Sequence, residues 1–231
     1  MSFDISEGLL WYIVFLYSTV CHEAAHAWAA LKLGDDTAYR GGQVSLDPLP
    51  HIRREPMGMV VVPLITFFSA GWMMGWASAP YNPQWAIRFP RRSAFMALAG
   101  PAANLVLVFL SGALLRFGVE WHWWQEPFIL TPTHLAEPIA GGVYPWLSTL
   151  LSIIFSLNLL LAVFNLLPLP SLDGSSLPLL FLHGATAQKY MAALWNPTFR
   201  MVGLVVAWQG FRYIFAPIRQ IAMQVLYPQA G

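Results

Sequence analysis

The chain has 231 residues, of which 57% are hydrophobic and only 10% are charged, whereas soluble domains carry about 25% charged residues. A net charge of +1 and so apolar a composition exclude nucleic-acid binding, and a single cysteine excludes an internal disulfide framework. The composition predicts an all-α, multi-pass membrane protein with about four to six membrane segments, folded as one domain over residues 1–231.

The first predicted span runs from about Gly8 to Leu33 and contains the sequence HEAAH. Residues 1–8 contain no Lys or Arg, so we expect no cleavable signal peptide and a first span that is retained. Three ionisable residues, His22, Glu23 and His26, lie in the second half of the span. Such residues are expensive inside a bilayer and indicate a functional site.

The spacing of these residues suits a catalytic metal. His22 and His26 lie four residues apart, so on a helix their rings project from one face and can bind the same ion. Glu23 is rotated by about 100° from His22, which places it beside the metal as a general base. Catalytic zinc holds three protein ligands and a water, so the motif predicts one Zn²⁺ per chain and requires a third ligand.

Two unusual segments follow the first span. Gly41 to Pro48, GGQVSLDP, opens with two glycines and alternates polar and apolar residues, which predicts a short β-hairpin. Met57 to Ala79 is uncharged and is broken by Pro63, Gly71 and Gly75. Loops with several Lys and Arg flank this stretch on both sides. If both loops are cytoplasmic, the stretch is re-entrant; the alternative is a conventional span.

Two cleaner spans are predicted from Ala94 to Leu115, where Pro101 should kink the helix, and from Trp146 to Leu167. Between them, Phe117 to Tyr144 has no Lys or Arg and predicts an external interfacial loop. We expect its tryptophans, Trp121, Trp123 and Trp124, to form an aromatic belt.

A short amphipathic piece, Leu177 to Trp195, and a last helix from about Thr198 to Tyr227 complete the chain. Arg212 and Arg219 fall within the last helix. This helix either spans the bilayer with both arginines facing protein or lies in the interface.

Several polar residues are candidates for the site. Asp173 follows a long uncharged run, where a metal would compensate its charge; the alternative is a turn residue before Gly174. Asn104 and Asn165 either bond neighbouring helices or donate to an oxyanion or to substrate backbone. The isolated histidines are assigned no ligand role: His51, His122, His134 and His183.

Three motifs occur in a specific order: HEAAH in the first span, AGPAAN in a later one and NLLPLPSLDG at the end of the next. With them the chain resembles the site-2 protease family of intramembrane zinc metalloproteases, in a compact form without a PDZ or nucleotide-sensing domain. The resemblance covers Gly8 to about Ser176. It implies that His22, His26 and Asp173 bind zinc and that Glu23 activates water.

The resemblance also implies hydrolysis of a peptide bond within or near the transmembrane helix of a membrane-tethered protein, as in regulated intramembrane proteolysis. The implied partners are the lipid bilayer and a single-span substrate, with membrane-tethered transcription regulators as examples. The implied location is the cell membrane, with the active site toward the cytoplasmic side. GGQVSLDP resembles a membrane-associated β-structure of the family, so one group of residues becomes a candidate edge strand for substrate: Gly42, Gln43, Val44 and Ser45.

Two rival interpretations use the same motif. A metal transporter would be expected to show an inverted repeat or further ionisable residues in its other spans, and the first, third and fourth spans show neither. A structural zinc site would close with four protein ligands, frequently cysteines, and the chain has one cysteine.

Overall fold

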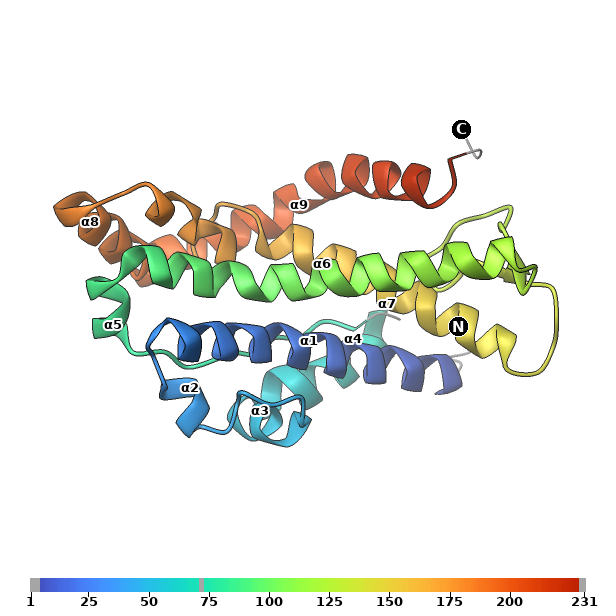
Figure 1. Cartoon of the computed structure of the whole chain (residues 1–231), viewed down its shortest axis with the longest axis horizontal. Helices are drawn as coiled ribbons and strands as arrows, with labels where there is room; N and C mark the ends of the chain where they lie inside the picture. Colours follow the sequence, from blue (N-terminus) through green and yellow to red (C-terminus); the bar gives the residue numbers. More distant parts are fainter. Residues whose placement is uncertain (1–4, 71–72, 229–231) are drawn as a thin grey trace.

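Three long helices lie side by side and form the centre of the molecule. In the computed structural model, which describes residues 5–70 and 73–228, they are α1 (Ile5–Leu33), α6 (Pro90–Glu120) and α7 (Tyr144–Asn165). A fourth long helix, α9 (Pro197–Leu226), lies along the outside of this group (Figure 1). Helix α6 is central, because it packs against α1, α7 and the short helix that follows α7.

Three of the described helices are long and apolar enough to cross a membrane: α6, α7 and α9. Helix α1, which is 29 residues long and contains the HEAAH motif, is not among them. The mostly helical, membrane-type fold is therefore confirmed, while a count of four to six membrane segments stays a prediction.

Three short helices lie toward one end of the long ones, α2 (Thr37–Arg40), α5 (Pro83–Arg88) and α8 (Gly184–Leu194), while α3 (Pro48–Arg54) lies beside the body of α1 (Figure 1). The 3-10 helix η2 (Asp173–Leu180) packs against α6. Helices α3, α5 and α9 each begin with an Asp or Asn N-cap followed by proline, an arrangement that favours a helix start. The side chains of Asp47, Asn82 and Asn196 each accept from a backbone N–H two residues on.

The hairpin predicted at Gly41 to Pro48 is wrong. This segment consists of turns and bends and leads into α3. Gly42 has a φ of +74°, and the Gln43 N–H donates to the Ala38 carbonyl, so the chain folds back on α2 instead of extending. Gln43 is buried, and its side chain donates to the Ser78 carbonyl.

The stretch from Met57 to Ala79 returns to the end of the molecule where it begins. It contains the π-helix η1 (Met57–Val61), α4 (Val62–Ala70) and, after residues 71–72, an extended segment. Ser78 accepts a hydrogen bond from Arg54 and donates to Glu55, which joins the two ends of the stretch. This path is the one that the re-entrant interpretation requires.

Glycines allow the two arms of this stretch to pack closely. A Cβ on Gly58 would lie 2.2 Å from the Trp76 carbonyl oxygen, and one on Gly75 would lie 2.1 Å from the Gly58 carbonyl oxygen. The predicted break at Gly75 is therefore a site of backbone contact, whereas the predicted break at Gly71 lies outside the described residues.

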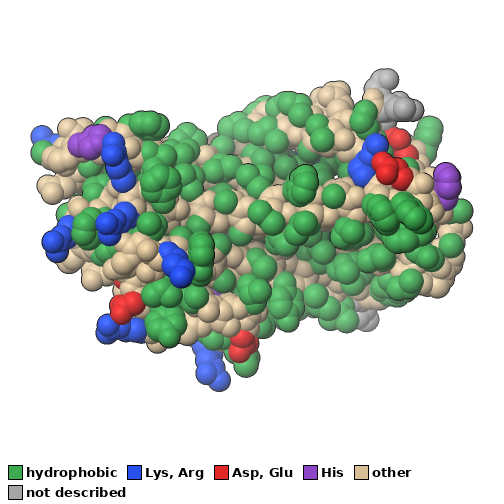
Figure 2. Space-filling view, viewed as in Figure 1, with side chains coloured by type: hydrophobic (Ala, Val, Ile, Leu, Met, Phe, Trp, Pro, Cys, Tyr) green, Lys and Arg blue, Asp and Glu red, His purple; other side chains and the backbone are tan. Residues whose placement is uncertain are grey.

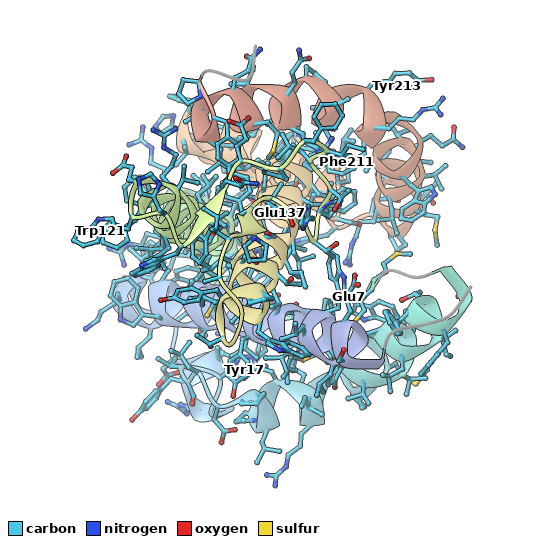
Figure 3. The ribbon with its side chains drawn as sticks, turned by 90° about the vertical axis from the view of Figure 1, so that its right-hand side faces the viewer. Glu7, Tyr17, Trp121, Glu137, Phe211 and Tyr213 are labelled. Carbon is cyan, nitrogen blue, oxygen red and sulfur yellow. The ribbon has the colours of Figure 1, made fainter. Side chains whose placement is uncertain are left out.

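The loop between α6 and α7 contains a short antiparallel pair that the sequence did not predict, β1 (Trp124–Gln125) and β2 (Glu137–Pro138). Trp124 is buried, and its indole N–H donates to the Leu115 carbonyl, so it belongs to the core and not to an aromatic belt. Trp121 is exposed and points outward at the rim in Figure 3.

The two arginines of α9 differ. Arg219 donates to the Leu130 carbonyl and so faces protein, as spanning requires. Arg212 is exposed and contacts Tyr213, which points outward in Figure 3. The prediction that both arginines of a spanning helix face protein therefore holds for one of them.

Candidate metal centre

Three side chains from two elements meet at one point. His22 and His26 lie on α1, and Asp173 is the first residue of η2. The two Nε2 atoms are 3.0 Å apart, and Asp173 Oδ2 lies 3.1 Å from His22 Nε2 and 3.4 Å from His26 Nε2. The structure thus brings together the three residues predicted as metal ligands, although Asp173 lies 151 residues after His22.

Packing places Asp173 at this point. Helix η2 joins a buried apolar cluster in which its Leu179 packs with residues of α1, α5, α6 and α8, among them Ala30 and Ala94. At the start of η2, a Cβ on Gly174 would lie 2.2 Å from the Leu166 carbonyl oxygen. Glycine therefore lets η2 approach the turn after α7 closely enough for Asp173 to face α1.

The hydrogen bonds of the two Nδ1 atoms show which tautomer each of His22 and His26 adopts. His26 Nδ1 lies 2.8 Å from the Met96 carbonyl oxygen, which can only accept, so Nδ1–H donates. His22 Nδ1 lies 2.6 Å from Asn104 Oδ1 and donates in the same way. Each neutral ring therefore presents the lone pair of Nε2 to the other ring and to Asp173.

This arrangement fits a cation. Two imidazole lone pairs and a carboxylate oxygen at such distances repel one another unless a proton or a metal ion lies among them. Two imidazoles and one carboxylate form a set of three ligands known from catalytic zinc sites.

Gly100 leaves room for such an ion. A Cβ at this position of α6 would lie 2.4 Å from His26 Nε2 and 2.5 Å from His22 Nε2. Gly100 was not predicted as a site residue, although the AGPAAN motif that contains it was the available signal. Any other residue would place side-chain atoms against the two nitrogens.

Glu23 lies beside the same point. It is buried, and one of its carboxylate oxygens lies within 4.8 Å of a nitrogen on each of His22 and His26. Within the described part of the chain, Glu23 makes no hydrogen bond or ion pair. A carboxylate this close to the two ring nitrogens is placed to accept a proton from a group held at the same point, so its position favours a role as a general base.

The two asparagine candidates differ in their contacts. Asn104 is fully buried: Oδ1 accepts from His22, and Nδ2 donates to Asn158 Oδ1 at 2.7 Å. These bonds favour the interhelical alternative for Asn104. Asn165 Nδ2 donates to the Leu161 carbonyl one turn back on α7, and its role toward substrate stays a prediction.

The remaining candidates do not join the centre. The predicted edge-strand residues, Gly42 to Ser45, lie in turns and bends and not in a strand. Among the isolated histidines, His51 is buried, and its Nε2 lies 3.1 Å from the Ser45 carbonyl oxygen. His134 pairs with Glu137 in the loop between α6 and α7.

Comparison with known proteins assigns the chain to a family. The profile of peptidase family M50 matches residues 10–208. The chain belongs to this family. The resemblance to the site-2 proteases is thereby confirmed.

Three relatives illustrate the similarity. The chain is 34% identical over 163 residues to a Bacillus subtilis protein provisionally named zinc metalloprotease YwhC; the match covers 70% of this chain and 64% of the relative. It is 29% and 30% identical over 160 residues to the Rip2 proteins of Mycolicibacterium smegmatis and Mycobacterium tuberculosis, which carry the same provisional description. Those matches cover 69% of this chain and 52% of each relative. No solved structure matches the chain.

Proposed function

We propose that this M50 family member is a zinc metalloprotease that hydrolyses a peptide bond within or near the transmembrane helix of a membrane-tethered protein. The observation that carries the proposal is the convergence of His22, His26 and Asp173 beside the buried Glu23, among long apolar helices. The provisional names of the relatives support zinc as the metal.

The proposal gives each residue one role. His22, His26 and Asp173 hold the zinc, which when bound lowers the pKa of water from about 15.7 to about 7 and polarises a carbonyl. Glu23 accepts the proton of the attacking water and passes it to the leaving amine. Asn165 is the candidate donor to the substrate backbone or to the developing oxyanion.

The depth of the centre supports a substrate inside the bilayer. In this proposal α1 also crosses the bilayer. His22 lies 11 residues before the end of α1, or about 16 Å along the axis, and a hydrocarbon core is about 30 Å thick. A peptide bond at that depth is hydrogen-bonded within its helix, so the substrate must unwind before the carbonyl is accessible. We therefore expect helix-breaking residues in a single-span substrate, such as a membrane-tethered transcription regulator.

The distribution of charge supports a cell-membrane location with the site toward the cytoplasm. Figure 2 shows most of the visible Lys and Arg side chains in the half of the molecule that contains α2, α3, α5 and α8, and few at the opposite end. The external loop from Phe117 to Tyr144 contains none. Because loops rich in Lys and Arg stay cytoplasmic, the end with the short helices faces the cytoplasm in this proposal.

The deciding experiment is Glu23→Gln, which keeps the size of the side chain but cannot accept a proton. Losing a general base costs about 10² to 10⁴ in rate. Purified variant should therefore bind one zinc per chain and leave a candidate single-span substrate uncut in a gel assay. Wild-type protein in the same detergent is the positive control.

The same experiment separates a protease from a metal carrier, because transport needs ligands and access but no acceptor for a proton of water. A Glu23→Gln variant that holds zinc and still cleaves near the wild-type rate would disprove the proposed mechanism.

A further inference from the structure

A chain of buried amides runs from the backbone of α7 to His22. Asn158 Nδ2 donates to the Ile154 carbonyl at 2.8 Å and to Ser18 Oγ at 2.9 Å. Asn158 Oδ1 accepts from Asn104 Nδ2 at 2.7 Å, and Asn104 Oδ1 lies 2.6 Å from His22 Nδ1. Asn104 and Asn158 are both 0% exposed, so water does not compete for these bonds.

The direction of this chain is fixed at its far end. A carbonyl only accepts, so the nitrogen of Asn158 must face Ile154 and its oxygen must face Asn104. Asn104 must then donate to Asn158, which leaves its own oxygen toward His22. An oxygen at that place requires a proton on His22 Nδ1 and so leaves the lone pair on Nε2.

We infer that Asn158 is a positioning residue for the metal centre: through Asn104 it selects the tautomer of His22 that can bind a metal. The inference rests on the proposed function, because only a bound metal makes use of the Nε2 lone pair. Asn158 does not touch the centre itself.

Loss of the Asn158 oxygen would act on Asn104 first. The amide of Asn104 could then rotate by half a turn and present its nitrogen to His22. A donor in that position favours an unprotonated Nδ1 and a proton on Nε2, and the protonated Nε2 cannot bind a metal. The consequence for the metal is therefore larger than the loss of one distant hydrogen bond suggests.

A merely structural role predicts something different. Ser18, Asn104 and Asn158 lie on α1, α6 and α7, so the same bonds also tie three helices together. If these bonds did nothing more than hold the three helices together, each variant would lose zinc affinity in proportion to its loss of thermal stability. If the orientation of Asn104 matters, zinc affinity depends on an acceptor oxygen at position 158.

The test compares two substitutions of nearly the same size in purified full-length protein. Asn158→Leu removes the acceptor and should weaken zinc binding, measured by competition with a chelator, about 10- to 100-fold. Asn158→Asp keeps the acceptor, and burial favours its neutral form, whose O–H can donate to Ile154 as the amide does. Its zinc affinity should stay near that of the wild type, whatever the change in Tm.

Ser152→Ala is the matched control. Ser152 is a buried polar residue of α7 that donates to the Ser148 carbonyl and accepts from the Leu135 N–H. Its loss should lower Tm without changing zinc affinity. If Asn158→Leu does not fold, Asn158→Ala removes the same acceptor and takes its place in the comparison.

The outcomes separate the inference from the function on which it rests. Wild-type zinc affinity in Asn158→Leu, or equal losses of affinity in the Leu and Asp variants, would overturn the positioning role while the zinc site stands. Wild-type protein that binds no zinc would overturn the proposed function, and the inference with it.

Discussion

At the scale of single residues, the metal centre depends on groups that only the fold brings together. Asp173 reaches the two histidines from η2. We expect Asp173→Ala to lower bound zinc well below one per chain and to abolish cleavage, because two neutral imidazoles leave the ion under-coordinated. Metal analysis of purified protein measures the first effect.

Asp47→Ala is a suitable comparison for this prediction, since it also removes a carboxylate. Asp47 caps α3, so its loss should cost about 1 kcal/mol of stability and leave zinc bound. Full zinc occupancy in Asp173→Ala would remove Asp173 from the set of ligands.

Gly100 allows a second prediction, in which helix propensity and metal binding oppose each other. Gly100→Ala should favour the α6 helix by about 0.5–1 kcal/mol but should place a methyl group against both Nε2 atoms. Overpacking costs about 1–3 kcal/mol, which corresponds to a loss of about 5- to 150-fold in zinc affinity. Gly112→Ala on the same helix meets Phe155 at 3.0 Å and should leave zinc affinity unchanged. Equal zinc affinity in the wild type and Gly100→Ala would show that this space is not used.

At the scale of elements, the stretch from Met57 to Ala79 decides the topology. In a Cys21→Ser background, cysteines at Leu46 and Gln84, which flank the stretch and are exposed, should both react with an impermeant thiol reagent from the cytoplasmic side. A cysteine at the exposed Gly141 should react from outside. Reaction of the Gln84→Cys variant from outside would replace the re-entrant path with a conventional span.

At the scale of the whole molecule, the metal should link helices that are far apart in sequence. Zinc holds α1 to η2 in the proposed site, and a ligand at 100 times its Kd stabilises a protein by about 2.7 kcal/mol. For a chain of this size, removal of zinc should therefore lower Tm by about 5–10 °C. Thermal unfolding with and without a chelator measures the shift, and Asp173→Ala should not respond. An unchanged wild-type Tm after verified removal of zinc would contradict this link.

The sequence by itself determined the features that depend on local spacing and composition. A separation of four positions places the rings of His22 and His26 on one helix face wherever the helix packs. Long apolar runs predicted α6, α7 and α9 to within a few residues, because helix length follows the thickness of the bilayer. The prediction of a hairpin at GGQVSLDP was wrong because it also relied on a local pattern. Alternation over a few residues does not distinguish a strand from a turn that is held by contacts with other segments.

Only the tertiary structure decided which distant residues meet. The packing of η2 against α1 and α6 brings the carboxylate of Asp173 to the two histidines, which the local sequence does not determine. The AGPAAN motif marks the segment that contains Gly100 but not its role, which lies in the space left empty beside α1. Asn158 carries no local signal, because its importance lies in two hydrogen bonds to other helices. Such contacts join residues tens of positions apart, and their energies depend on how the helices pack and not on the order of residues within any one of them.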